Sequence, residues 1–452
     1  MLVWALGVAA PAWVSAAEFR TDFNVGLTET YTDNVSAASS DGTATWVRQV
    51  SPGVSVRGEG RHLNLEVDYR LQDISYAKGR GADAQFHQLN AAANLKALKD
   101  QFNLSARVTH SQQIINEQGT VTNSNITATT NRTNVGTLSL SPDLNLRLGD
   151  VAIVNGRVGY DQVSYQTGAN PGGANKSLVL GVSSGSRFNK VGWSLTANGS
   201  RDGSSNAIQR SMRGQLSYRV GPKTSVFGGT GWENNDFQSA VNPEGSIWDL
   251  GVNWNAGPRT SVSASIGNRY FSRTYSTNIT HAMRRSNLSL SYNQSLATTS
   301  TLQLGQPVFD DTGTVLVGFG VPVEATNVFI TESLAGNYAL SSRRSRVSLS
   351  VNRLQRESTA TQVEDSILTL SGGVSVTFPS SIAVSLNGTH RIAEFGLTSQ
   401  QDEFTSVGLS ASRPLGRDVN LSASYQRQWQ SSTSSAAEFE ENQLSFSVGF
   451  TM

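Results

Sequence analysis

Short segments in which apolar and polar residues alternate one by one recur along almost the whole chain. Residues 63–72 read LNLEVDYRLQ, residues 138–148 read LSLSPDLNLRL, and residues 444–450 read LSFSVGF. Because neighbouring side chains of a β-strand point to opposite faces, each segment has one apolar and one polar face when extended. The pattern therefore predicts many amphipathic strands, and an all-β fold.

Composition shows what the apolar faces meet. Only 37% of the 452 residues are hydrophobic, which is low for a soluble chain that must fill a core of this size. Disordered chains lack such periodicity, and beyond residue 17 no apolar run reaches the roughly 20 residues of a membrane-spanning helix. Strands with lipid on one face and water on the other fit both observations.

Charge and cysteine content exclude other classes. Lys and Arg number 35 against 34 Asp and Glu, so the chain has no general basic field to hold a nucleic acid. The absence of cysteine removes thiolate metal sites, thiol catalysis and disulfides. No pair of residues stands out as a nucleophile and its base, so the sequence predicts no enzymatic activity, no cofactor and no metal site.

Short and long connections alternate along the chain. Tight-turn residues occur at Gly149-Asp150, Gly257-Pro258-Arg259 and 298–300, whereas longer polar connections are expected at 114–130, 273–280 and 306–327, among others. This rhythm is typical of a transmembrane up-and-down antiparallel β-barrel with short periplasmic turns and long extracellular loops. Counting gives about 22 strands, within a range of 16–24, provided that Thr301–Leu304 begins one. A soluble β-sandwich or solenoid is the alternative.

The first 17 residues differ from the rest. They are uncharged and apolar and end in Val-Ser-Ala-Ala, a small-x-small site of the kind that signal peptidase cuts. We expect a signal peptide over 1–17 and a single outer-membrane barrel domain over 18–452, with an uncleaved membrane anchor as the alternative. A TonB-dependent transporter also has 22 strands but needs a folded plug before the first one, for which residues 18–22 leave no room.

Two sets of apolar residues have expected roles in the membrane. Tryptophans near predicted strand ends would form the interfacial girdles. The last strand carries an alternating apolar face that we expect the barrel assembly machinery to read as an assembly signal. That set is Leu444, Phe446, Val448 and Phe450.

The polar faces predict the lining of the lumen. Acids and arginines are mixed there, so no ring of one sign imposes ion selectivity. The charged residues expected to line the lumen are Glu66, Asp68, Arg70, Arg107, Asp143, Arg147, Arg346 and Arg356.

The long connection 306–327 is unusually apolar and is treated as an insertion in the barrel. Phe309, Asp310, Asp311 and Phe319 belong to it. Apolar side chains are costly to leave in water, so this loop is a candidate constriction folded into the lumen. A surface for a partner and a wall extension above the membrane are the alternatives.

The segment Leu27–Val35 reads LTETYTDNV, and Val328-Phe329-Ile330 is followed by a turn at Arg343-Arg344-Ser345. These stretches resemble an uncharacterised proteobacterial outer-membrane barrel family associated with the PEP-CTERM/exosortase system, itself similar to β-barrel porins of exopolysaccharide loci. The resemblance implies location and genetic association, and it implies no reaction.

The sequence thus predicts a protein of the Gram-negative outer membrane. The expected function is a porin-like pore for passage or export of a polar solute such as exopolysaccharide, and the alternative is a non-conducting envelope scaffold. The expected partners are outer-membrane lipid and lipopolysaccharide, the barrel assembly machinery, and exopolysaccharide or its export components.

Overall fold

The computed structural model describes residues 18–452 except 78–80, 82, 100, 167–171 and 305–326. The predicted signal peptide and almost all of the 306–327 loop, including Phe309, Asp310, Asp311 and Phe319, lie outside the described residues.

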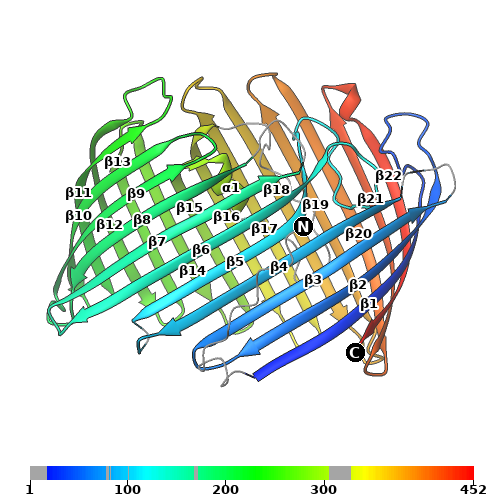
Figure 1. The fold of residues 1–452 in the computed structure, drawn as a ribbon, viewed down its shortest axis with the longest axis horizontal. Helices are drawn as coiled ribbons and strands as arrows, with labels where there is room; N and C mark the ends of the chain where they lie inside the picture. The colour runs from blue at the N-terminus through cyan, green and yellow to red at the C-terminus, as the bar shows by residue number, and fades with distance from the viewer. Residues whose placement is uncertain (1–17, 78–80, 82, 100, 167–171, 305–326) are drawn as a thin grey trace.

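The described residues form 22 strands and two short helical segments (Figure 1). In chain order these elements are β1 (Glu18–Thr32), β2 (Thr45–Glu59), β3 (Leu63–Tyr76), β4 (Ala84–Ala97), β5 (Phe102–Ile114), β6 (Arg132–Leu148), β7 (Ala152–Tyr165), β8 (Gly173–Ser184), β9 (Val191–Asp202), β10 (Ile208–Gly221), β11 (Thr224–Asp236), β12 (Glu244–Gly257), β13 (Thr260–Asn268), β14 (Arg273–Ala282), β15 (Ser286–Thr298), α1 (Thr299–Leu304), β16 (Val328–Ser341), β17 (Ser345–Ser358), β18 (Glu364–Thr377), β19 (Ala383–Phe395), β20 (Gln400–Leu415), β21 (Val419–Ser432), η2 (Ser435–Ala437) and β22 (Phe439–Thr451).

The strands close into a single antiparallel barrel. Each strand pairs with the next one in the chain, and β1 also pairs with β22 from Asn24 opposite Thr451 to Thr32 opposite Gln443. Closure satisfies the backbone groups that an open sheet edge would leave unpaired, which is a requirement for a sheet surrounded by lipid. The predicted antiparallel barrel with about 22 strands is confirmed.

Two elements differ from the sequence prediction. The predicted connection 273–280 is part of β14, and Thr301–Leu304 belongs to the helix α1 instead of a strand. In β14 polar residues occupy both faces, as at Thr274 and Thr277, so the apolar and polar alternation that reveals the other strands is weak there. The prediction therefore misses one strand at β14 and adds one at Thr301–Leu304, so the total of 22 is still correct.

The barrel has two different ends. The turns that follow the even-numbered strands are short, and the C-terminus lies at that end (Figure 1). The connections that follow the odd-numbered strands lie at the other end, and the segments 33–44, 115–131 and 299–327 are the longest among them. We refer to these as the short-turn end and the long-connection end.

The outer face is apolar and exposed. Leu216, Leu250 and Phe446 are more than half exposed, as are several other large apolar side chains along the wall. Trp232 of β11 and Trp254 of β12 are similarly exposed, each near the C-terminal end of its strand. Because these strands are antiparallel, the two rings lie toward opposite ends of the barrel, where a transmembrane barrel carries its aromatic girdles. Burial of such a surface in hydrocarbon, about 25 cal/mol per Å², is what makes a low overall hydrophobic content sufficient.

Candidate functional site

The connection 115–131 between β5 and β6, which we call the crossing loop, lies inside the barrel and identifies the inner face of the wall. In this loop, Asn125 Nδ2 donates a hydrogen bond of 2.7 Å to Gln72 Oε1 of β3, and Thr127 Oγ1 donates one of 2.8 Å to Glu441 Oε2 of β22. Residues two apart along a strand share a face, so the faces of Gln72 and Glu441 line the lumen.

The charged residues predicted to line the lumen lie on this inner face. On β3, Asp68 accepts a 2.6 Å hydrogen bond from Ser55, and on β5 the Arg107 side chain donates to Asn90 at 3.4 Å. Of these predicted residues, only Arg356 is buried, and the others are half-buried or exposed. The eight residues are Glu66, Asp68 and Arg70 on β3, Arg107 on β5, Asp143 and Arg147 on β6, and Arg346 and Arg356 on β17.

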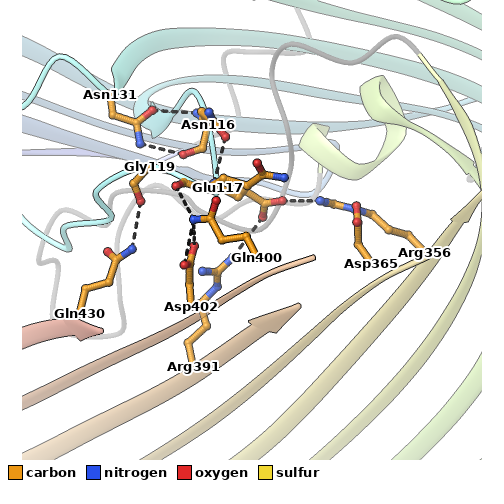
Figure 2. Close-up of polar contacts among 11 residues, drawn as sticks. Asn116, Glu117, Gly119, Asn131, Arg356, Asp365, Arg391, Gln400, Asp402 and Gln430 are labelled. Carbon is orange, nitrogen blue, oxygen red and sulfur yellow. Dashed lines mark hydrogen bonds and ion pairs between the residues drawn. The ribbon is translucent and has the colours of Figure 1, made fainter. Parts of the chain in front are cut away.

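A buried carboxylate attaches the crossing loop to the far wall (Figure 2). Glu117 forms ion pairs with Arg356 of β17 and with Arg391 of β19, the second at 3.3 Å. The three side chains are 2%, 3% and 1% exposed, respectively. Arg356 also holds Asp365 of β18 through its Nε atom at 3.0 Å. A charged side chain buried this far from water is stable only when groups of opposite charge lie against it. An uncharged residue at position 117 would not supply the carboxylate that the two arginines require.

The position of these partners shows that the loop spans the lumen. β17 lies eleven strands from β6 around a ring of 22 strands, which is the opposite side of the barrel. The crossing loop therefore passes from one wall to the other.

Amide side chains from β20 and β21 hold the backbone of the loop. Gln400 Nε2 donates to the Gln118 carbonyl at 2.8 Å, and Gln430 Oε1 accepts from the Val121 N–H at 2.8 Å. Gln430 Nε2 also donates to the Gly119 carbonyl at 3.1 Å. These side chains meet main-chain groups that would otherwise be buried without partners.

The loop is also braced within itself at its base. The Asn131 side chain accepts from the Asn116 N–H at 2.8 Å and donates to the carbonyls of Asn116 and Thr120 at 2.7 and 3.0 Å. One asparagine thus ties both ends of the loop together, which reduces the entropic cost of closing it.

Two further bridges cross the lumen at the same end. Thr298, the last residue of β15, donates a 2.7 Å hydrogen bond to Asp202 of β9, and Ser300 of α1 is 2.9 Å from Ser204. Near β17, Thr359 accepts from the Ala240 N–H at 2.7 Å through its carbonyl. The long-connection end is therefore bridged at three places. The described turns of the opposite end are too short to cross.

The loop predicted as the constriction and the loop observed in the lumen are two different connections. The predicted loop 306–327 lies outside the described residues except for Asn327, whereas the connection expected at 114–130 is the one seen in the lumen. Glu117 and Arg391 were not among the predicted site residues. Their only local signal was a single acid in an otherwise uncharged loop and an arginine on the polar face of a strand.

The predicted assembly residues lie on the outer face of β22. Phe446 and Phe450 are 51% and 40% exposed, and Phe450 is opposite Val419 of β21 and Val25 of β1. Leu444 and Val448 share that face by the alternation of the strand. Recognition of this face by the assembly machinery stays a prediction.

Two features are absent from the described residues. Within those residues, no cluster of three or more His, Asp or Glu side chains is arranged to hold a metal ion. No helix in the same part of the chain has the length and apolar character needed to span a membrane.

Comparison with known proteins places the fold. No family model matches the sequence, and no curated protein matches it. Among solved structures, a mutant of the ferric enterobactin receptor from Pseudomonas aeruginosa in complex with enterobactin is similar, at 11% identity and a TM-score of 0.50, covering 96% of this chain and 81% of that one. The FrpB iron transporter from Neisseria meningitidis is 11% identical with a TM-score of 0.49, covering 95% and 82%. Identity this low shows a shared fold alone.

The architecture settles where the protein resides. A closed antiparallel barrel with an even number of strands, an apolar outer face and a polar inner face is the structure that spans the bacterial outer membrane. The protein is an outer-membrane β-barrel of a Gram-negative bacterium. Its short turns face the periplasm and its long connections face outward, so the three bridges lie at the extracellular mouth.

Proposed function

We propose that the protein is a porin-like pore for a polar solute, closed in its resting state by the crossing loop. The observation that carries the proposal is the polar attachment of this loop to the opposite wall through Glu117, Arg356 and Arg391. A barrel of this size encloses a lumen wide enough for an aqueous channel, and a loop held by hydrogen bonds and ion pairs can exchange those partners for water. The extracellular mouth can then open without unfolding the wall.

The inner wall supports a polar solute. Below the crossing loop, inward positions carry small hydroxyl and amide side chains, such as Ser445 and Ser447 of β22, which pair with Thr30 and Thr28 of β1 at 2.8 and 2.9 Å. Charged inward residues of both signs are interspersed, so the lumen favours neither cations nor anions overall. From the resemblance of Leu27–Val35 to the exosortase-associated family, we further propose that the solute belongs to an exopolysaccharide system.

Enzymatic activity is not part of the proposal. His87, His281 and His390 lie on the outer face, and each has a hydroxyl 2.7 to 2.8 Å from its Nδ1 atom instead of a carboxylate. A histidine that works as a general base needs a group that orients it and access to a polar substrate. These three side chains face lipid.

A non-conducting scaffold is the second candidate. Three separate bridges at one mouth favour it, because each adds a contact that must break before solute passes. The two candidates differ in one measurable property, which is whether removal of the crossing loop produces a conducting barrel.

Conductance in planar bilayers tests the proposal. The experiment compares the intact protein with a variant in which residues 118–130 are replaced by a short Gly/Ser linker. The matched control replaces 397–399, a second extracellular connection in which Leu397 is 80% exposed, with Gly-Ser-Gly. We expect the intact protein and the control to open rarely and the loop variant to conduct steadily. A correctly folded loop variant that stays silent at all voltages would support the scaffold.

A further inference from the structure

The periplasmic rim has a strongly one-sided charge. Five consecutive short turns, from the one between β8 and β9 to the one between β16 and β17, contain eight basic residues and no acidic one. We call this set the basic arc. Its members are Arg187, Lys190, Lys223, Arg259, Arg284, Arg285, Arg343 and Arg344.

The side chains of the basic arc are available to a ligand. All eight residues are exposed, and within the described part of the chain none of them forms an ion pair. Lys223 donates a 3.3 Å hydrogen bond to the Ala256 carbonyl, and Lys190 lies 5.9 Å from the centre of the Tyr218 ring. Neither contact neutralises the charge of its lysine.

The other short turns of the rim carry equal numbers of basic and acidic residues, so the excess of positive charge is confined to the basic arc. The remaining five turns contain three basic and three acidic residues in total, and the turn 378–382 contains no charge. The acidic residues there are Asp100, Asp150 and Asp418.

Strand geometry gives the length of the arc. Successive turns at one end of an antiparallel barrel are two strands apart, and strands are spaced by about 4.8 Å, so each step is about 10 Å and four steps span about 40 Å. A small anion would occupy one turn at most. An array of this length fits a linear polymer with an anionic group at each repeat.

The positive charge continues into the lumen. Arg219 of β10 and Arg346 of β17 lie on the inner face, near the periplasmic ends of strands that border the arc, and both are exposed. A mouth lined by one sign of charge raises the local concentration of oppositely charged solute. The arc and these two arginines together lead from the rim into the barrel.

We propose that the basic arc binds an acidic polysaccharide at the periplasmic entrance of the barrel, before the polymer enters the lumen. This inference rests on the proposed pore function and specifies the charge of its solute. The periplasmic leaflet surrounds the barrel evenly, so a role in holding anionic lipid headgroups would not account for a basic half and a balanced half of the same rim. A polymer that approaches from one side does account for it.

Binding of a defined polyanion tests the proposal. The probe is size-fractionated polygalacturonate, with dextran of matched size as the neutral polymer, and the full-length barrel is held in phosphatidylcholine nanodiscs. The test variant combines Arg284→Ser, Arg285→Ser, Arg343→Ser and Arg344→Ser. The matched control combines Arg61→Ser and Lys99→Ser in the balanced half of the rim.

We expect the intact barrel and the control to bind polygalacturonate but not dextran, with affinity that falls steeply as salt is added. Since an exposed ion pair contributes little individually, the loss of four charges is expected to weaken binding about tenfold at low salt. Gel mobility with and without heating verifies that the variant barrel is folded. Unchanged binding by a folded variant, or an equal loss in the control, would overturn the proposal.

Nanodiscs that contain phosphatidylglycerol separate the polymer from the lipid. If these discs abolish polymer binding, and if the arc variant loses thermal stability only in them, lipid headgroups occupy the arc and the proposal is wrong. Conductance keeps the two hypotheses apart. A barrel that conducts but binds no polyanion contradicts this inference alone, whereas one that binds polyanion but stays silent after loop replacement contradicts the pore function alone.

Discussion

Removal of the Glu117 carboxylate is expected to release the crossing loop while leaving the barrel folded. In Glu117→Ala, Arg356 keeps its 3.0 Å contact with Asp365, but both arginines lose the acid that the loop brings to them. Breaking a fully buried ion pair by deleting one partner costs about 3–5 kcal/mol. This free energy destabilises the closed position of the loop and leaves the barrel wall unaffected, because the strand pairings do not involve Glu117.

That cost corresponds to a population of released loop about two to four orders of magnitude larger than in the intact protein. Amide hydrogen exchange measures it directly, through faster exchange at Val121, whose N–H donates to Gln430. Single-channel recordings are expected to show correspondingly more frequent openings. Amides of β9 to β12, whose described residues form no hydrogen bond or ion pair with the loop, provide the internal reference.

A surface ion pair supplies the matched control. Glu440 lies 2.7 Å from Arg427, with 55% and 49% of their side chains exposed, so Glu440→Ala is expected to cost at most about 1 kcal/mol. It should leave both exchange and conductance unchanged. If Glu117→Ala exchanges and conducts like the intact protein, the buried pair does not hold the loop, and the reasoning from its burial is refuted.

Four other substitutions test the wall and its connections. Val67→Arg places a cation in lipid at a cost of about 2–4 kcal/mol and should lower the yield of folded barrel, whereas Asp68→Arg on the lumen face should be tolerated; equal yields would refute the assignment of faces. Phe450→Ala should reduce the heat-modifiable folded fraction, and an unchanged fraction would show that assembly does not depend on this side chain. Asp202→Ala removes the acceptor of Thr298 and should speed exchange in α1 about ten- to a hundredfold, since a hydrogen bond to a charged group contributes about 1.5–3 kcal/mol; unchanged exchange would mean that the bridge does not hold α1.

Which side chains of a strand point to the lumen and which point outward was predictable, because this depends on local sequence alone. A strand alternates with a period of two, so the apolar Val67 assigns its neighbour Asp68 to the lumen wherever the strand lies in the ring. The same rule failed to detect β14, where Thr274 and Thr277 make both faces polar. A lumen-facing residue needs no apolar partner, so alternation is strong only where the outward face is strongly apolar.

The attachment of the crossing loop to the far wall was not predictable from local pattern. Glu117 is 239 residues from Arg356 and 274 residues from Arg391 in the chain, and nothing near it in sequence indicates either partner. The apolar content of 306–327 directed the prediction to that segment. That criterion assumes that a loop enters the lumen to escape water, whereas the crossing loop is held chiefly by hydrogen bonds and charge.

The chemistry of the crossing loop also determines which part of it moves. Ile126 packs with Val35, Val47 and Ile74 in an apolar cluster, and burial of such side chains contributes about 1.5–3 kcal/mol each. The half around Glu117 is held mainly by polar contacts, and a neutral hydrogen bond that water can replace contributes only about 0.5–1.5 kcal/mol. Opening also hydrates Glu117 together with Arg356 and Arg391, so it leaves no buried charge unpaired and does not incur the cost of deleting one partner. Opening should therefore begin at Glu117 and leave Ile126 in place, so that the loop swings from one wall toward the other and stays within the mouth.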